Sequence, residues 1–403
     1  VGDGDCIETH RFGISAVREC RCLYTLFGCD CRCCSCRYNA GCRSSYIECF
    51  PTRGISSSFV FVGCLQGSHL WLRIGILSFG SRIVSCMSVV ESIKSATSTA
   101  FSFEILPPLK GNSMDSIMNT IDVLREFDPK YINITTHRSE RVREWNADGT
   151  LRVLSRRRRP GTVAVAAAIH HKYNIPVVPH ILCGGFTREE TEYVLIDLQF
   201  LGITDLLLLR GDKAAEENYY LPTSGGNAFA IDLQRQVNDF NRGLFEDGSS
   251  MNRPIVPFRY GMACYPEKHE DSPSLESDVL LAKKKVDAGA EYLVTQMFYD
   301  NRKYFDFVDK CRACGIDVPI IPGLKPLRKA SQLDVLPRLF HIEMPDALVA
   351  EMKRCTTDEQ AAEVGIEWCT MQALELKAKG VPSIHFYALN ATQSVKRVAQ
   401  KVY

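Results

Sequence analysis

The sequence lacks an excess of charge of either sign. Its 403 residues include 48 lysine and arginine residues and 47 aspartate and glutamate residues, so the formal net charge is only +1. This balance gives no electrostatic reason for general binding to nucleic acid or to an anionic membrane, and we expect neither partner. With 45% hydrophobic and 24% charged residues, the composition is that of an ordinary soluble globular chain, long enough for one large domain or two ordinary ones.

Lysine and methionine are absent from residues 1–86, which nevertheless hold 12 of the 18 cysteines. The cysteines of CDCRCCSCR, residues 29–37, are open to interpretation as a zinc module or a disulfide knot, although their spacing matches no common zinc finger. A third interpretation, which we favour, is translated upstream sequence. We therefore expect residues 1–86 to be a cysteine-rich segment that is not native or is disordered, and Met87 to be the native start.

Several motifs with a defined chemistry are also missing. No HxH or HExxH pair indicates a metal site, and no GxSxG elbow indicates acyl transfer. Lys285 lies in a helical pattern and not at a strand end, so a Schiff-base aldolase is unsupported. The apolar run at residues 71–79 is too short to span a bilayer. The six cysteines after residue 87 are scattered, which indicates a reducing, cytoplasmic setting.

What the sequence does contain is a regular alternation of strand and helix patterns after residue 98. The strand patterns are short, β-branched and almost continuously apolar, which is typical of parallel strands buried on both faces. Strands are predicted at residues 99–107, 131–135, 176–182, 205–212, 260–266, 291–300, 318–324 and 383–390. Helices are predicted at residues 113–127, 160–174, 187–202, 277–290, 301–315 and 391–401, with several more within 328–380.

Eight strands alternating with helices match an α/β fold, the (β/α)8 TIM barrel, which usually needs about 250 residues. We predict this barrel for residues 87–403. A doubly wound sheet is the alternative architecture, because strand order cannot be determined from the sequence. No GxGxxG motif follows the first predicted strand, which weakens that alternative.

Polar residues stand at the carboxyl ends of almost all the predicted strands. In a barrel these ends form the catalytic face. A single histidine or glutamine in such a place is often only a satisfied core group, but repetition at the same end of so many strands indicates a site. The candidates are Glu104, Thr135, Thr136, His180, Arg210, Asp212, Tyr265, Glu267, His269, Gln296, Tyr299, Tyr387 and Asn390.

The segments that carry these residues resemble one family. FSFEILPP, residues 101–108, resembles the FEFFPP signature of methylenetetrahydrofolate reductase, and LLLLRGD, residues 206–212, resembles its LRGD loop. YPEKH, VTQMFYD, PGLKPL and HFYALN follow in the family's order. The resemblance covers roughly residues 99–395 and is to the bacterial type, which has a single catalytic domain.

The resemblance implies a barrel flavoenzyme of one-carbon metabolism. FAD would lie across the strand ends, be reduced by NAD(P)H as a co-substrate, and then reduce 5,10-methylenetetrahydrofolate to 5-methyltetrahydrofolate for methionine synthesis, in a ping-pong sequence. We also expect a homo-oligomer. Two alternatives stay open: a folate-binding barrel methyltransferase without redox chemistry, and a non-catalytic folate-binding protein.

Glu104 is the residue that this chemistry requires most directly. The folate ring must open to a 5-iminium cation before hydride arrives, and opening needs a proton on the departing nitrogen. Burial disfavours the charged form of a carboxyl group. Phe103 and Ile105 flank Glu104, and Pro107 and Pro108 follow it. We therefore expect apolar neighbours to keep Glu104 protonated, so that it acts as the general acid.

The resemblance implies roles for the other candidates as well. Asp212 matches the family's aspartate beside the flavin and the pterin, and we expect it to be catalytic with Glu104. The implied substrate-binding positions are Glu104, Asp212, Gln296, Tyr299 and Tyr387. The implied FAD-binding positions are Thr135, Thr136, His180, Arg210, Gly211, Asp212, Phe229, Ala230, Tyr265, His269, Asp278 and Lys285.

The chain departs from the family's pattern at two places. Leu106 replaces the second aromatic residue of the signature, and Ala391 stands where the family often carries arginine, which puts one folate contact in doubt. Lys110 and the four arginines Arg156 to Arg159 have no assigned role. We expect the arginines to form a solvated loop before a helix, with a phosphate or polyglutamate contact as the alternative.

Overall fold

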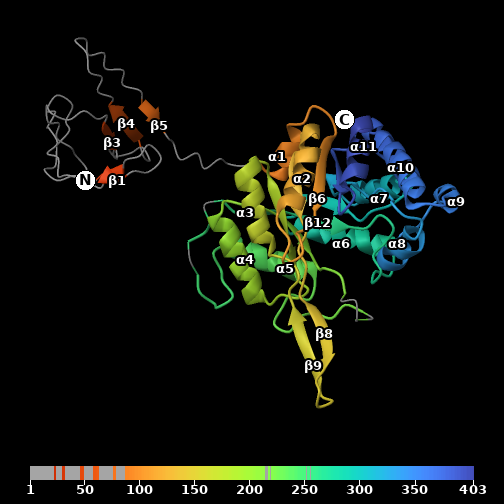
Figure 1. Ribbon diagram of the computed structural model, residues 1–403, viewed down its shortest axis with the longest axis horizontal. Coiled ribbons are helices and arrows are strands. Elements are labelled where there is room, and N and C mark those ends of the chain that lie inside the picture. The colour runs from red at the N-terminus through yellow and green to blue at the C-terminus, as the bar shows by residue number, and fades with distance from the viewer. Residues whose placement is uncertain are drawn as a thin grey trace, which may run out of the picture. The chain divides into compact units, whose positions relative to one another are not determined.

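The computed structural model describes residues 87–403 except 214–216, 218, 251 and 255, together with short strands before residue 87 (Figure 1). The chain divides into two compact units, Val1–Cys86 and Met87–Tyr403. Apart from two residues of β2, the cysteine cluster at residues 29–37 lies outside the described residues, so the interpretations of residues 1–86 stay predictions. The strands of the first unit are β1 (Cys22–Leu23), β2 (Asp30–Cys31), β3 (Tyr46–Cys49), β4 (Ser58–Val62) and β5 (Ile76–Ser78).

Parallel strands of the second unit form a sheet that curves into a barrel. Their spatial order is β14-β13-β12-β11-β10-β7-β6-β16-β15, and every neighbouring pair is parallel. Each predicted strand corresponds to one or two of these elements. They are β6 (Ala100–Ile105), β7 (Tyr131–Ile134), β10 (Val177–Leu182), β11 (Asp205–Leu209), β12 (Arg259–Cys264), β13 (Tyr292–Thr295), β14 (Ile320–Ile321), β15 (Gly323–Leu324) and β16 (Ser383–Tyr387).

The barrel closes through an interrupted strand. β14 pairs with β13, and β15, which follows one residue later, pairs with β16. The residue between them is Pro322, which has no backbone N–H for a ladder. The Gly323 N–H donates to the Thr295 hydroxyl at 2.9 Å. With β14 and β15 counted as one strand, the described residues form a (β/α)8 TIM barrel, which confirms the predicted fold class and excludes the doubly wound sheet.

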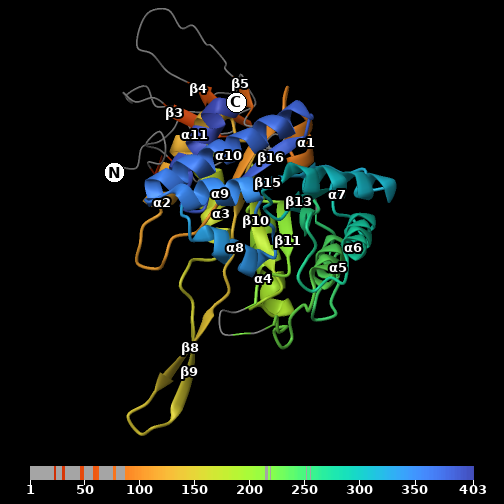
Figure 2. The same ribbon diagram turned by 90° about the vertical axis from the view of Figure 1, so that its right-hand side faces the viewer.

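Helices surround the barrel (Figures 1 and 2). Every predicted helical segment contains at least one helix, whereas α1 and α5 were not predicted. None of the described helices combines the length and the apolar character needed to cross a bilayer. The helices are α1 (Val89–Lys94), α2 (Asp115–Leu124) with the 3-10 turn η2 (Arg125–Phe127), α3 (Thr162–Tyr173), α4 (Arg188–Phe200), α5 (Ala230–Asn241), α6 (Leu275–Asp287), α7 (Asn301–Ala313), α8 (Gln332–Phe340), α9 (Asp346–Arg354), α10 (Asp358–Ala378) and α11 (Thr392–Val402).

Side chains alternate between the two faces of each barrel strand, and this alternation decides which residues can reach the interior. On β6, Phe101, Phe103 and Ile105 belong to the main hydrophobic core, which they share with residues of the surrounding helices. Ser102 and Glu104 therefore face the inside of the barrel.

Helix α1 packs on the amino-terminal end of the barrel. Val89 and Ile93 share a hydrophobic cluster with residues from the beginning of several strands, including Tyr131. The backbone N–H of Val89 donates to the Asp205 carboxylate at 3.1 Å, and Asp205 also pairs with Arg259 at 2.9 Å. Because this end is covered by a packed helix, a ligand cavity is expected at the carboxyl ends of the strands.

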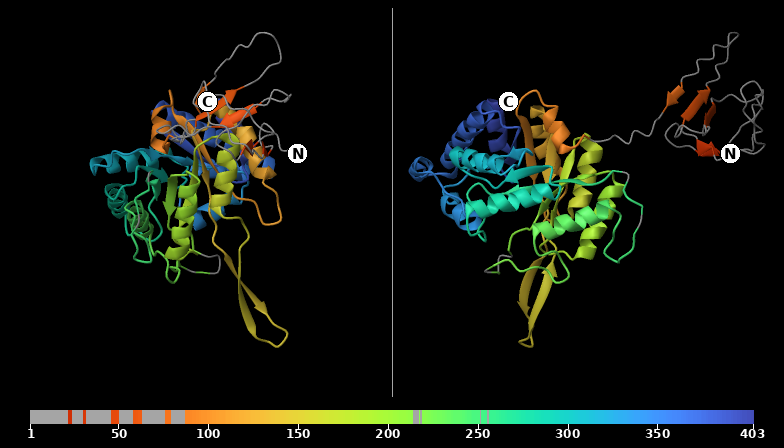
Figure 3. Two further views of the ribbon diagram at one scale, coloured as in Figure 1. Left: turned by 90° about the vertical axis from the view of Figure 1, so that its left-hand side faces the viewer. Right: turned by 180° about the vertical axis from the view of Figure 1, so that it is seen from behind.

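A hairpin that the sequence analysis did not predict stands between β7 and α3. Strands β8 (Glu140–Trp145) and β9 (Leu151–Arg156) pair antiparallel and project away from the barrel (Figures 2 and 3). Arg156 ends β9, so the expectation of a loop is wrong at that residue. The strands carry many charged residues, so their sequence lacks the apolar pattern by which strands are predicted. Arg158, just beyond β9, pairs with Glu140 at the hairpin's base.

We predict that Gly365→Ala destabilises the barrel unit. Gly365 lies in α10, and a Cβ atom there would be 2.1 Å from the carbonyl oxygen of Leu327. Relieving such an overlap requires the helix to shift, at a cost of about 2–3 kcal/mol in the free energy of unfolding. Denaturant unfolding measures this value. Glu367→Ala, on the exposed side of the same helix, should change it by less than about 0.5 kcal/mol. Equal stabilities of the two variants would contradict the close helix contact.

Candidate active site

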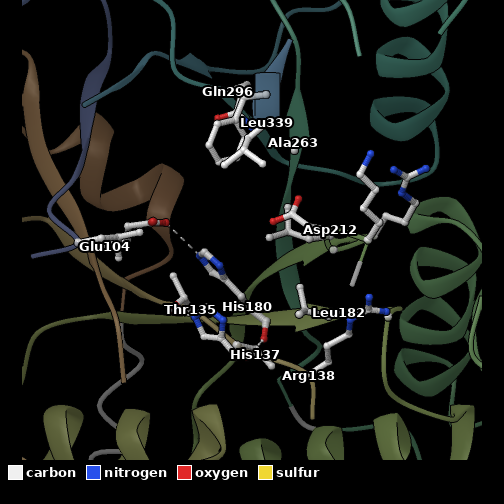
Figure 4. A pocket seen from close by; sticks show the side chains of 18 of the residues that line it. Glu104, Thr135, His137, Arg138, His180, Leu182, Asp212, Ala263, Gln296 and Leu339 are labelled. Atoms are coloured by element: carbon white, nitrogen blue, oxygen red, sulfur yellow. Dashed lines mark hydrogen bonds and ion pairs between the residues drawn. The ribbon is translucent and has the colours of Figure 1, made fainter. Parts of the chain in front are cut away.

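The carboxyl ends of the strands surround a cavity of about 940 Å³. Glu104, His180, Asp212 and Gln296 extend toward a common space from different parts of the barrel (Figure 4). Strand closure therefore brings together side chains that are far apart in the sequence. The predicted site residues that line the cavity are Glu104, Thr135, Thr136, His180, Arg210, Gly211, Asp212, Tyr265, His269, Gln296 and Tyr387.

Other predicted site residues lie outside the cavity lining, and three of them hydrogen-bond to backbone groups of residues that line it. The Tyr299 hydroxyl donates to the carbonyl of Lys325 at 3.2 Å. Lys285 donates from Nζ to a carbonyl of β12 at 2.7 Å, and Asp278 accepts the backbone N–H of His269 at 2.7 Å. Their direct contact with a ligand stays a prediction. The residues outside the lining are Glu267, Asp278, Lys285, Tyr299, Asn390, and Phe229 and Ala230 at the start of α5.

Glu104 is 6% exposed and faces two imidazole rings. Its Oε2 atom lies 3.8 Å from Nε2 of His385 and 3.9 Å from Nε2 of His180. These separations are too long for hydrogen bonds. Both Nε2 atoms are buried and have no hydrogen-bond partner in the described structure. The other ring nitrogen of His385, Nδ1, lies 3.0 Å from the hydroxyl oxygen of Ser102.

Opposing effects act on the pKa of Glu104. Burial raises this pKa, but an N–H of His385 directed at the carboxylate and positive charges on His180, His385 and Lys325 lower it by more. Burial lowers the pKa of His180 to about 4, so the His180 ring is neutral at pH 7. At neutral pH, the His180 ring therefore adds no positive charge beside Glu104.

The expectation that apolar neighbours keep Glu104 protonated is wrong. Phe103 and Ile105 precede and follow Glu104, but they point to the opposite face of β6 and into the outer core. The inner face of β6 carries Ser102 beside Glu104, and Ser102 lies opposite His385 in the register of β16. The carboxyl group is therefore buried among polar groups and not among apolar ones.

Asp212 belongs to the loop after β11 and supplies a second carboxyl group to the cavity. Burial and the charge of Glu270 raise its pKa by more than the positive charge of Arg210 lowers it. Arg210 pairs with Asp271 at 2.5 Å. Gly211 has a φ of 84°, which glycine adopts without strain, and this turn lets both of its neighbours line the cavity.

The second unit matches a known family over nearly its whole length. A family model described as "Methylenetetrahydrofolate reductase" matches residues 89–403. The chain belongs to the methylenetetrahydrofolate reductase family. This match confirms the resemblance that FSFEILPP and LLLLRGD indicated.

Curated relatives from plants and bacteria are similar to this chain. Methylenetetrahydrofolate reductase (NADH) 1 from Arabidopsis thaliana is 30% identical over 321 residues, which cover 76% of this chain and 49% of the plant protein. The 5,10-methylenetetrahydrofolate reductase of Salmonella typhimurium is 29% identical over 297 residues, which cover 72% of this chain and 86% of the bacterial protein. The chain thus spans about half the length of the plant relative.

The barrel also contains residues near Glu104 that the sequence analysis did not propose. Asn133 lies opposite Glu104 in the register of β7 and is fully buried, with no partner for its amide group in the described structure. His385 lies two residues before Tyr387, on the same face of β16. Strand alternation could have identified His385, whereas Asn133 could be recognised only after the neighbouring strands were known. The additional residues near Glu104 are Ser102, Asn133, His137, Lys325 and His385.

We predict a pH-dependent loss of stability that His180 causes. Its pKa is lowered from 6.5 to about 4 in the folded protein. Between pH 6.5 and about pH 4, this histidine is protonated in the unfolded chain but neutral in the folded protein. The free energy of unfolding therefore falls as the pH falls, by on the order of 3 kcal/mol over this range. Denaturant unfolding of the wild type and of His180→Asn across this range measures the effect.

The His180→Asn variant should lose less stability than the wild type between neutral pH and about pH 4. His171→Asn, which changes an exposed histidine of α3, should retain the wild-type loss. Parallel pH profiles for the wild type and His180→Asn would contradict the burial of a neutral His180.

Proposed function

We propose that this chain reduces 5,10-methylenetetrahydrofolate to 5-methyltetrahydrofolate, with NAD(P)H as the hydride donor and FAD as the bound cofactor. The proposal depends on one observation: Glu104, Asp212 and Gln296 line the same cavity in a chain of this family. Glu104 would serve as the acid, Asp212 as the carboxylate that contacts cofactor and substrate, and Gln296 as an amide contact. The plant relative's name specifies NADH, which favours NADH as the donor.

The residues around the cavity fit a flavin. Arg210 and His269 are suited to a pyrophosphate, which needs cations and hydrogen-bond donors. The buried Nε2 of His180, which has no partner in the described structure, could bind a polar atom of the ring system. FAD, when bound, would accept hydride from NAD(P)H and deliver it to the folate. Apolar side chains of the cavity that would contact the ring are Leu182, Leu207, Leu209, Ala263 and Val294.

Glu104 would give the proton that opens the folate ring. A carboxyl group whose pKa lies below its ordinary value is seldom protonated at neutral pH, and each pKa unit corresponds to about 1.4 kcal/mol. An aromatic substrate that covers Glu104 would remove water from the carboxyl group and so raise its pKa. Because Glu104 lies deep in the barrel, a bound substrate would cover it, so its pKa would rise in the complex in which the proton is transferred.

We predict that Glu104→Gln separates the two half-reactions. Glutamine keeps the shape of the side chain but has no acidic proton. The flavin-loaded variant should still be reduced by NAD(P)H, while reoxidation of its flavin by 5,10-methylenetetrahydrofolate should slow by about 10²–10⁴-fold. Anaerobic stopped-flow absorbance of the flavin measures each half-reaction.

The matched control is Glu363→Gln, which removes a carboxylate paired with Arg397 on the surface of α10. This variant should retain both half-reactions. Unchanged folate reduction in Glu104→Gln would contradict the acid role. A colourless wild-type protein without flavin would contradict the reductase proposal and favour the methyltransferase alternative.

We predict that Asp212→Asn raises the midpoint potential of the bound flavin. A carboxylate beside the ring disfavours the anionic reduced form, and an amide does not. Because burial raises the pKa of Asp212, the difference from the wild type should be small at acid pH and should grow as the pH rises through that pKa. Spectroelectrochemical titration measures it. A lower potential, or a difference independent of pH, would contradict this role.

A further inference from the structure

The β8–β9 hairpin and the loop after it bring arginine side chains to the cavity. Arg143 of β8, and Arg158 and Arg159 of the loop after β9, belong to the cavity lining. Arg156 and Arg157 do not belong to it. The sequence left open whether the four consecutive arginines form a solvated loop or contact an anion. Of these four, only Arg158 and Arg159 lie where they could contact an anion in the cavity.

The three arginines of the lining differ in how their charge is balanced. Arg158 pairs with Glu140 at 2.6 Å. Arg159 is half-buried and donates from Nη1 to the carbonyl oxygen of Pro107, which is a neutral acceptor. Neither Arg159 nor Arg143 forms an ion pair with a carboxylate in the part of the chain that the structure describes. Because a partly buried cation usually has an opposite charge beside it, the charge of Arg159 is available to an anionic ligand.

Hydrogen bonds hold this pair of arginines beside the first strand of the barrel. The backbone N–H of Lys110 donates to the carbonyl oxygen of Arg158 at 2.7 Å, and Arg159 donates to Pro107 in the same turn. This turn directly follows β6, the strand that carries the proposed acid. Burial and the charge of Arg159 also lower the pKa of His137, which lines the cavity. The position of Arg159 is thus fixed before a ligand arrives, which keeps the loss of side-chain entropy on binding small.

The two faces of the hairpin differ in their charge. On one face, Glu140 and Glu144 lie opposite arginines in the register of the strands, so acids and cations balance each other. Residues at the alternate positions form the other face, which has no acidic residue. The hairpin projects away from the barrel (Figure 3), so an anionic chain that leaves the cavity along this second face would meet no carboxylate of the hairpin. The described side chains of the second face are those of Arg143, Trp145, Leu151, Val153 and Ser155.

We propose that Arg159 and Arg143 bind the carboxylates of an acidic chain on the folate substrate, namely several linked glutamate residues. This binding rests on the proposed function, in which the pterin ring reaches Glu104 and the glutamate-bearing end of the molecule points out of the cavity. A guanidinium group binds a carboxylate through two parallel hydrogen bonds. Arg159 stands near the barrel and Arg143 farther out along β8. Two separated cations suit an extended chain better than the compact pyrophosphate of a dinucleotide.

The test measures the ratio of two dissociation constants. Isothermal titration of the full chain with 5-methyltetrahydrofolate, the product of the proposed reaction, gives one constant for the form with one glutamate and another for the form with five. We expect the wild type to bind the longer form about tenfold more tightly at low salt. The double variant Arg143→Gln with Arg159→Gln should lose this preference. The same two positions changed to lysine keep their positive charge and should retain a preference of about threefold or more.

The matched control is Arg157→Gln, which removes an exposed arginine of the same loop that lies outside the cavity lining. This variant should keep the wild-type preference. Equal affinity of the wild type for the two forms would overturn the inference, as would the same loss of preference in Arg157→Gln. A lysine variant that loses the preference as fully as the glutamine variant would overturn the role of charge. A glutamine variant that keeps the preference but loses affinity for NADH would replace the acidic chain by a dinucleotide phosphate.

Failure of this binding site can be distinguished from failure of the proposed function, because the titration needs no turnover. A wild type that reduces 5,10-methylenetetrahydrofolate but binds both forms of the product equally would contradict the binding site alone. A wild type that prefers the longer form but reduces no folate would contradict the proposed function alone.

Discussion

The contact between the Glu104 carboxyl group and the imidazoles of His385 and His180 is the constraint on which the rest of the site depends. The three side chains come from β6, β16 and β10. β6 and β16 are paired neighbours and only β7 separates β6 from β10, so the inward curve of this part of the sheet brings the side chains together. A buried carboxylate without polar partners would destabilise the fold by several kcal/mol. The curvature of the sheet and the chemistry of its open end are therefore parts of one arrangement, in which neighbouring strands bury an acid and place polar groups around it.

The surrounding structure serves this arrangement at both ends of the barrel. Helix α1 covers the amino-terminal end, which leaves the carboxyl end for the cavity. Before Pro322, β14 pairs with β13, and after it β15 pairs with β16. The chain then reaches Lys325, whose charge acts on Glu104. Gly365 of α10 packs against Leu327 in this same turn, so an outer helix supports a loop of the site. The hairpin contributes Glu140 and Arg158 at its base, and Arg143 farther along β8, to the cavity lining.

The sequence predicted the barrel well because buried parallel strands are almost continuously apolar, and all eight predicted strands are present in the described structure. It did not predict the hairpin, whose strands carry charges on a solvated ribbon. Glu104 was identified correctly as a buried strand-end residue, but its environment was inferred from Phe103 and Ile105, which share its sequence neighbourhood and not its face of the strand. The real neighbours, Ser102 aside, come from other strands, so they follow from register and closure, which local sequence does not contain.

The protonation state of Glu104 is the central claim, and infrared spectroscopy tests it most directly. The spectrum of the flavin-loaded protein at neutral pH, with the folate substrate bound, should contain the C=O stretch of a protonated carboxyl group. We expect this band to be absent from Glu104→Gln and to remain in Asp212→Asn. A wild-type spectrum without a protonated carboxyl band, or a band that persists in Glu104→Gln, would contradict the account.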